Sequence, residues 1–169
     1  MTDAPDSAAR PTVYVETSVI SYLAANPSGD TVTRANQKLS RDWWVRRGYW
    51  DLYTSTVAVG EMVRGDHGTA VKRLELLGDL VLLTVVPEAK RLAAEILRRG
   101  LLPEKARLDA EHTAIAAVSG MAYIVTWNLK HIANSAIRER VQAVCHSAGY
   151  QPAKACTPED LLRTLSNAK

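Results

Sequence analysis

RLDAEHTAIAAVSGMAYIVTWNLKHIAN, the stretch from Arg107 to Asn134, indicates how the whole chain folds. Its first part is rich in alanine and has helical spacing, which predicts a helix over residues 107–119 that ends at Gly120. The next run, AYIVTW, is almost continuously apolar and predicts a strand that is buried on both faces. A helix that leads directly into such a strand is typical of a sheet with parallel strands.

The same alternation continues along the rest of the chain. Short apolar and β-branched runs predict strands at residues 12–16, 49–55, 80–86, 122–127 and 154–157, and helical patterns separate them. The helix predicted over residues 87–100 starts with Pro87 and ends with Gly100, as helix termini prefer. We therefore expect a single-domain α/β/α sandwich with a central, mainly parallel sheet.

The length and the N-terminal composition set the expected boundaries of this domain. The chain has 169 residues, enough for one domain with a sizeable core and too few for two. Residues 1–11, MTDAPDSAARP, are predicted to be a flexible leader before a domain at 12–166, because they lack the pattern of a signal peptide. No apolar run is long enough to span a membrane, so we expect a cytoplasmic protein without membrane contact.

The charges and the cysteines are less informative. The formal net charge is +3, which makes nucleic acid a reasonable partner if several carboxylates are gathered in one pocket and leave the remaining surface more positive. Cys145 and Cys156 lack the spacing of a metal site, and we expect two buried thiols. In the helix predicted over residues 30–47, helical spacing puts Val32, Ala35, Leu39 and Trp43 on one face. Its basic face comprises Arg34, Lys38 and Arg41.

Oxygen-bearing side chains stand where the predicted strands and helices meet. Glu16 ends the first strand, Asn128 lies just past the fourth, and Asp109 lies in the first turn of the helix before that fourth strand. Glu61 lies in the helix after the second strand. Ligands of open parallel sheets bind at the carboxyl ends of the strands, so we expect these four side chains to meet at one edge.

Three carboxylates in one place would repel one another. At about 4 Å and an effective dielectric constant near 20, each pair of like charges costs about 4 kcal/mol. Protonation, a basic side chain or a divalent cation could offset this repulsion, and a set of oxygen ligands suits Mg²⁺ or Mn²⁺. The chain has no glycine-rich phosphate loop and no nucleophile elbow, which leaves metal-assisted phosphoester chemistry as the favoured use of these acids.

Each candidate also has a purely local explanation. Asp109 suits the positive end of a helix, Asn128 is common in turns, and Glu61 can pair with Arg64 one turn later, whereas Glu16 has no such explanation. Helical spacing puts His112 and Thr113 on the face of Asp109 and directs Glu111 away from it. His112 and His131 could lie behind the metal ligands or contact a phosphate of the substrate. Alternatively, they are ordinary surface or capping histidines.

The segments VYVETSVISYL, TSTVAVGEMVRGD, LDAEHTAIAAVSGMAYIVTWNLKHIAN and CTPEDLL resemble, in order and spacing, the motifs of the PIN (PilT N-terminus) domain. More narrowly, the chain resembles the VapC-like toxin nucleases from about Val13 to Leu162. This resemblance implies an α/β/α sandwich and an Mg²⁺- or Mn²⁺-dependent endoribonuclease, the toxin of a type II toxin–antitoxin pair. It also implies a homodimer and an antitoxin whose helix lies between the early helices.

The resemblance implies catalytic and metal-binding roles for Glu16, Glu61, Asp109 and Asn128. Glu16 replaces the usual Asp, and Asn128 stands where many members have a fourth Asp, which disfavours two tightly bound metals. Residues that we expect near the RNA substrate are Thr17, Ser18, Arg64, His112, Trp127, Lys130 and His131. The remaining tryptophans, Trp43, Trp44 and Trp50, are expected in the core or an interface.

Two alternatives to a nuclease stay open. The first is a catalytically inactive PIN-like module that binds RNA or acts as a scaffold, which the departures at Glu16 and Asn128 would favour. The second is a phosphoacceptor domain with an acidic pocket. It is less consistent with the sequence, because no Asp at a strand end is followed by a partnering Lys at a later strand.

Overall fold

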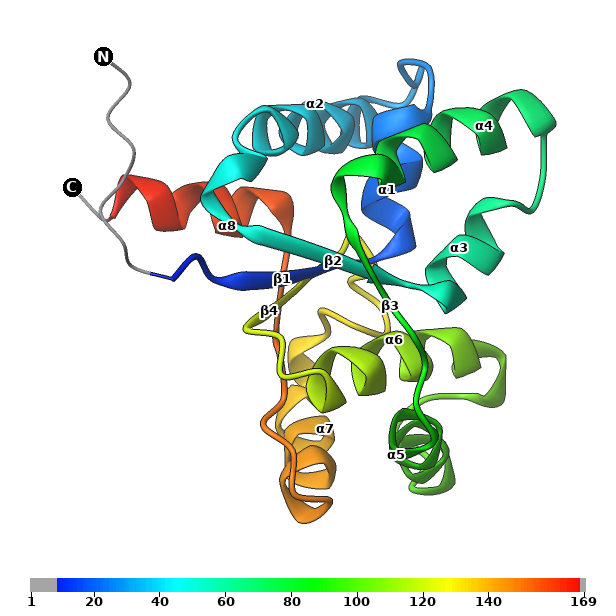
Figure 1. The fold of residues 1–169 in the computed structure, drawn as a ribbon, viewed down its shortest axis with the longest axis vertical. Coiled ribbons are helices and arrows are strands. Elements are labelled where there is room, and N and C mark those ends of the chain that lie inside the picture. The colour runs from blue at the N-terminus through cyan, green and yellow to red at the C-terminus, as the bar shows by residue number, and fades with distance from the viewer. Residues whose placement is uncertain (1–8, 168–169) are drawn as a thin grey trace.

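A computed structural model describes residues 9–167, and its centre is a five-stranded parallel sheet with the order β3-β2-β1-β4-β5 (Figure 1). The strands are β1 (Thr12–Val15), β2 (Asp51–Ser55), β3 (Val81–Leu83), β4 (Tyr123–Val125) and β5 (Lys154–Cys156). Tyr14 in the central strand lies opposite Tyr53 of β2 and Ile124 of β4. The predicted α/β class and the parallel sheet are confirmed.

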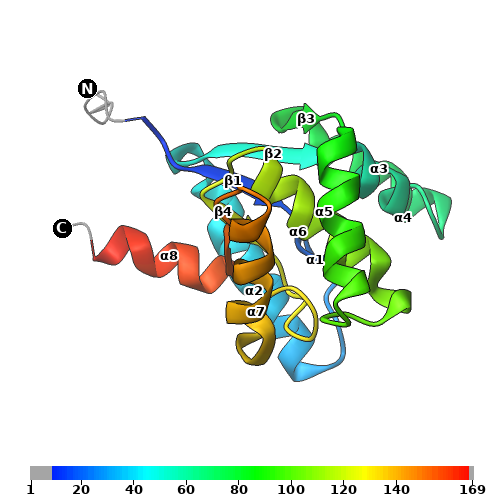
Figure 2. The same cartoon turned by 90° about the horizontal axis from the view of Figure 1, so that it is seen from below.

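Helices cover both faces of this sheet. On one face lie α1 (Thr17–Ala24), α2 (Thr31–Val45), α4 (His67–Leu76) and α8 (Pro158–Ser166), and on the other lie α5 (Pro87–Arg98), α6 (Arg107–Val118) and α7 (Ser135–Ser147) (Figures 1 and 2). The short helix α3 (Thr56–Met62) follows β2 and contacts α1, α4 and α6. It therefore joins the two helical layers at the carboxyl edge of the sheet. Short 3₁₀ turns lie at Arg47–Tyr49, Leu77–Asp79 and Glu104–Ala106.

The central strand is buried on both sides, as the sequence predicts. Val13 and Val15 pack with Trp43 and Trp50 in one apolar cluster, whereas Tyr14 packs in a second cluster on the opposite face. Trp43 and Trp50 are therefore core residues, as expected. Both cysteines are also buried and unpaired, as predicted.

The edge strand β3 does not follow the prediction of burial on both faces. Val81 and Leu82 are 56% and 53% exposed, and the strand covers residues 81–83 instead of the predicted 80–86. The physical reason is its place at the edge of the sheet, where β2 is its only hydrogen-bonded neighbour among residues 9–167. An apolar run alone does not tell a central strand from an edge strand.

Only part of the apolar face predicted for α2 is buried: Trp43 is buried and Leu39 half-buried, whereas Val32 and Ala35 are exposed. The buried residues of α2 are Gln37, Ser40 and Trp43, whereas Val32 is 68% exposed. Gln37 is buried because its amide accepts a hydrogen bond from Ser28 N (2.9 Å) and donates to the carbonyl oxygen of Asn26 (3.0 Å). Satisfied polar side chains thus take positions that periodicity assigns to the solvent side.

The N-terminal boundary is described only in part. Residues 1–8 of the predicted leader lie outside the described residues. Arg10 already contacts the domain, because its guanidinium donates to the carbonyl oxygen of Gly48 (3.0 Å) and lies 3.2 Å from the carboxylate of Asp51. Within residues 9–167, no helix is long and apolar enough to cross a membrane.

Candidate metal centre

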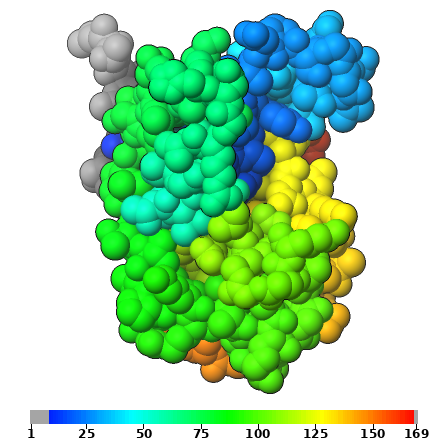
Figure 3. Space-filling view, turned by 90° about the vertical axis from the view of Figure 1, so that its right-hand side faces the viewer, coloured from blue at the N-terminus to red at the C-terminus, as the bar shows by residue number. Residues whose placement is uncertain are grey.

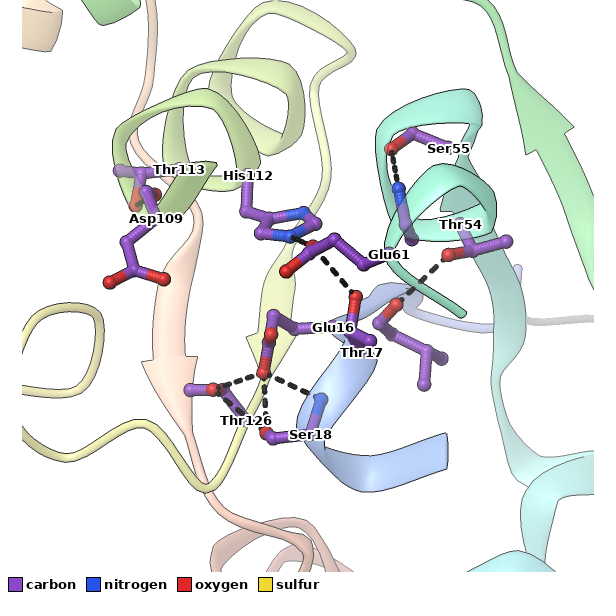
Figure 4. A network of polar contacts seen from close by, with 12 residues as sticks. Glu16, Thr17, Ser18, Thr54, Ser55, Glu61, Asp109, His112, Thr113 and Thr126 are labelled. Carbon is purple, nitrogen blue, oxygen red and sulfur yellow. Dashed lines mark hydrogen bonds and ion pairs between the residues drawn. The ribbon is translucent and has the colours of Figure 1, made fainter. Parts of the chain in front are cut away.

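Glu16 lies directly after β1 and forms the N-cap of α1, and it is only 5% exposed. Its Oε2 atom accepts hydrogen bonds from Ser18 N (3.1 Å), from Ser18 Oγ and from Thr126 Oγ1 (2.8 Å) (Figure 4). Its Oε1 atom accepts none from any described residue. The side chain is therefore held at one oxygen and is free at the other.

Glu61 projects from α3, and its two carboxylate oxygens also differ in their hydrogen bonds. Its Oε1 atom accepts a hydrogen bond from Thr17 Oγ1 (3.0 Å) and contacts His112 Nε2, whereas Oε2 accepts none from the described part of the chain. Burial alone would raise the pKa of Glu61, but the hydrogen bond and charge of His112, with smaller contributions from Thr17 and Arg64, hold this pKa below its ordinary value. Glu61 is therefore ionised at neutral pH.

Asp109 lies in the first turn of α6, and its partner is His131. His131 Nδ1 lies 2.8 Å from Asp109 Oδ2, and Oδ1 accepts no hydrogen bond from residues 9–167. The backbone N–H of His131 donates to Asn128 Oδ1 (2.9 Å), so the amide oxygen of Asn128 closes the turn that presents His131.

The structure brings some of the predicted side chains together directly and connects another through an intermediate residue. Glu16, Glu61 and His112 each offer a ligand atom, and these atoms lie within 4.8 Å of one another. Asp109 projects from α6 beside His112, with its carboxylate facing the space next to Glu16 (Figure 4). The amide oxygen of Asn128 accepts the backbone N–H of His131, the residue whose ring contacts Asp109, so Asn128 is connected to the centre through His131.

The position of this group agrees with the expected edge of the sheet. Figure 3 views the side on which β1 and β2 end, and there α1, α3, α6 and the segment after β4 meet, with the start of α1 recessed between the others. Each acid thus comes from a different element, and folding is needed to bring the acids together.

The donor set fits a divalent cation. Glu16, Glu61 and Asp109 each bind protein donors through one oxygen and keep the second oxygen free, which supplies the oxygen ligands that Mg²⁺ and Mn²⁺ prefer. None of the ion pairs found among residues 9–167 joins these acids to a lysine or an arginine. Burial alone would lower the pKa of His112, but the hydrogen bond to Glu61 and the nearby carboxylates raise it above its ordinary value.

The other predicted residues surround the centre in different ways. Trp127 is half-buried, and its indole N–H donates to Ser40 Oγ (2.7 Å) while its ring stacks on Tyr22. Arg64 and Lys130 are exposed, in the segments that follow α3 and β4. The described side chains of Arg64 and Lys130 are therefore free to meet a ligand from solvent.

Sequence reasoning missed Thr126, Tyr14 and Ser55. Thr126 is fully buried and bridges the centre, because its hydroxyl donates to Glu16 and accepts from Asn128 N (2.9 Å). The hydroxyl of Tyr14 lies 2.7 Å from Ser55 Oγ and 2.7 Å from His112 Nδ1. The two-residue period of a strand was an available signal, since Tyr14 and Glu16 point to the same side of the sheet.

No family model matches this chain, and a comparison with curated proteins gives no match. Two solved structures are similar to it. The structure of VapC20 from Mycobacterium tuberculosis, a Sarcin-Ricin loop cleaving toxin, is 21% identical with a TM-score of 0.57, covering 73% of this chain and 95% of that one. The structure of VapBC2 from Rickettsia felis, bound to a DNA fragment from their promoter, is 12% identical with a TM-score of 0.53, covering 86% of this chain and 98% of that one. At these identities the likeness concerns the fold, and this chain has the PIN-like α/β/α fold of the VapC type.

Proposed function

We propose that this protein is an Mg²⁺- or Mn²⁺-dependent endoribonuclease. One observation carries the proposal: three carboxylates, those of Glu16, Glu61 and Asp109, each keep one free oxygen at the carboxyl edge of a VapC-type sheet. Gathering these charges costs free energy, and a bound cation offsets that cost. The similarity to a toxin that cleaves the Sarcin-Ricin loop favours RNA as the substrate.

The surrounding residues have distinct roles in this proposal. Glu16, Glu61 and Asp109 would hold the ion, and Asn128 would act through the turn that presents His131 to Asp109. A bound Mg²⁺ or Mn²⁺ would supply a Lewis acid that lowers the pKa of water and stabilises charge on the phosphodiester.

The hydrogen bonds of the centre would keep these ligands in place. Ser18 and Thr126 fix Glu16, Thr17 fixes Glu61, and His131 fixes Asp109. Side chains that are already held lose little conformational entropy when a ligand binds.

A cleavage assay tests the proposal. Purified protein is incubated with a defined RNA that contains a stem and a single-stranded loop, in the presence of Mn²⁺, and the products are separated on a sequencing gel. We expect internal cuts whose number depends on enzyme concentration. Binding of Mn²⁺ without any cleavage, across a broad set of RNAs, would instead support the inactive RNA-binding module.

Substrate binding would depend on basic residues beside the centre. Lys130 is exposed in the segment between β4 and α7, and Lys130→Ala is expected to weaken RNA binding to all sequences and to lower the salt slope by about 1. Fluorescence anisotropy of a labelled RNA at several salt concentrations, in EDTA to prevent cleavage, measures both effects.

Lys154→Ala is the matched control. Lys154 is exposed but starts β5, at the opposite end of the parallel strands. An equal loss of affinity in both variants would show that Lys130 has no particular role in binding RNA.

We further propose that the chain is the toxin of a type II toxin–antitoxin pair and that it acts as a homodimer in the cytoplasm. The support is the structural similarity to VapBC2 from Rickettsia felis. Light scattering at micromolar concentration tests the dimer, and a strict monomer would contradict it.

A further inference from the structure

A buried series of hydrogen bonds leads from Ser55, at the end of β2, to Glu61 in the metal centre. Ser55 Oγ lies 2.7 Å from the hydroxyl of Tyr14, which lies 2.7 Å from His112 Nδ1, and His112 Nε2 contacts Glu61 Oε1. Ser55, Tyr14 and His112 are fully buried. These four residues come from β2, β1, α6 and α3, so the hydrogen bonds connect four separate elements.

The direction of these hydrogen bonds follows from the donors and acceptors available. A carboxylate oxygen accepts hydrogen bonds, so His112 Nε2 carries the hydrogen between the two residues. In the neutral ring Nδ1 is then an acceptor, and the Tyr14 hydroxyl donates to it. The Tyr14 oxygen accepts from Ser55, whose own oxygen accepts from Ala58 N (3.4 Å). One assignment therefore gives a donor and an acceptor to every hydrogen bond from Ser55 to Glu61.

The same contact to Glu61 persists when the ring is protonated. Nδ1 then donates to the Tyr14 oxygen, and the Tyr14 hydroxyl turns to donate to Ser55. The Tyr14 hydroxyl can donate or accept a hydrogen bond, so it can serve in both directions. Because Nε2 carries a hydrogen in either state, the orientation of the ring does not depend on its charge.

The hydroxyl of Tyr14 can both donate to His112 Nδ1 and accept from it at 2.7 Å, and a side chain without a hydroxyl cannot. A phenylalanine at position 14 would leave His112 Nδ1 buried without a partner, and the ring would turn or admit water to satisfy it. Glu61 Oε1 would then keep only its hydrogen bond from Thr17 (3.0 Å). The second carboxylate oxygen, Oε2, which faces the space between Glu16 and Asp109 (Figure 4), would be held less firmly.

We infer that Tyr14 is a positioning residue of the metal centre: its hydroxyl holds His112 with Nε2–H directed at Glu61, which leaves Glu61 Oε2 directed at a bound cation. The inference rests on the proposed function, because it gives Tyr14 a role through the same centre. Tyr14 itself does not touch the cation or the RNA.

Nuclear magnetic resonance of protein with ¹⁵N-labelled histidine tests the inference in the absence of metal. In the wild type we expect the His112 ring to show a slowly exchanging Nε2–H and a hydrogen-bonded Nδ1. Tyr14→Phe is expected to shift the Nδ1 signal and to speed the exchange of Nε2–H with water. The matched control is Tyr53→Phe, since Tyr53 lies opposite Tyr14 in the sheet and its hydroxyl binds no described residue.

A second measurement tests whether the orientation of the His112 ring affects metal binding. Calorimetric titration with Mn²⁺ is expected to give a dissociation constant about 10-fold higher for Tyr14→Phe than for the wild type or Tyr53→Phe, a size typical of residues behind metal ligands. Unchanged nitrogen signals and unchanged affinity in Tyr14→Phe would overturn the inference, even if the protein cleaves RNA. Changes in both, in a protein that cleaves no RNA, would support the inference and contradict the nuclease.

The wild-type spectrum decides the question even if Tyr14→Phe does not fold. A His112 ring with its hydrogen on Nδ1 and none on Nε2 would be incompatible with the proposed role. Equal effects of Tyr14→Phe and Tyr53→Phe would also overturn it, because they would reflect a general loosening of the sheet.

Discussion

Asp109→Asn is expected to lower metal-dependent RNA cleavage by at least about 100-fold while the fold is retained. The reason lies in the contact between Asp109 Oδ2 and His131 Nδ1, which are 2.8 Å apart. In the variant His131 would hold the single amide oxygen, and the amide nitrogen would take the place of the free carboxylate oxygen. A hydrogen-bond donor then faces the cation where a negatively charged ligand is required.

The measurement is the rate of RNA cleavage under saturating Mn²⁺, together with circular dichroism to verify the fold. Glu111→Gln is the matched control, because it also removes one charge from α6, and helical spacing directs its side chain away from Asp109 and His112. We expect Glu111→Gln to keep nearly full activity. A variant of Asp109 that cleaves RNA like the wild type would show that Asp109 is not a ligand.

Removing the metal is expected to abolish cleavage and to lower the thermal stability of the protein. Without a cation, the close carboxylates of Glu16 and Glu61 repel each other, and His112 offsets only part of that repulsion. Mn²⁺ at 100 times its dissociation constant stabilises a single-site protein by about 2.7 kcal/mol. For a domain of this size, that energy corresponds to a rise in melting temperature of about 5–10 °C.

Differential scanning calorimetry in EDTA and in excess Mn²⁺ measures this shift, and RNA cleavage is followed in the same two buffers. The Asp109→Asn variant provides the comparison, since its shift should be clearly smaller. An equal shift in both proteins would place the stabilising ion elsewhere. Cleavage that continues in EDTA at the wild-type rate would exclude the proposed metal dependence.

Much of the fold could be predicted because it depends on local patterns. Continuous apolar runs separated by helical patterns predicted a parallel sheet, and the five observed strands lie within the predicted ranges. The predictions were wrong where burial depends on distant neighbours. Val81 and Leu82 are apolar but exposed because β3 lies at the edge, and Val32 on the predicted apolar face of α2 is exposed as well.

The candidate site was likewise predictable from the sequence only in part. The sequence by itself determined which oxygen-bearing residues stand at the strand ends and helix starts, because strand and helix periods set the direction of a side chain on its own element. Only the tertiary structure decided the partners: His112 contacts Glu61, His131 contacts Asp109, and Asn128 closes a turn. The physical reason is that each of these contacts with a carboxylate joins separate elements, and the packing of those elements sets the distance between their side chains.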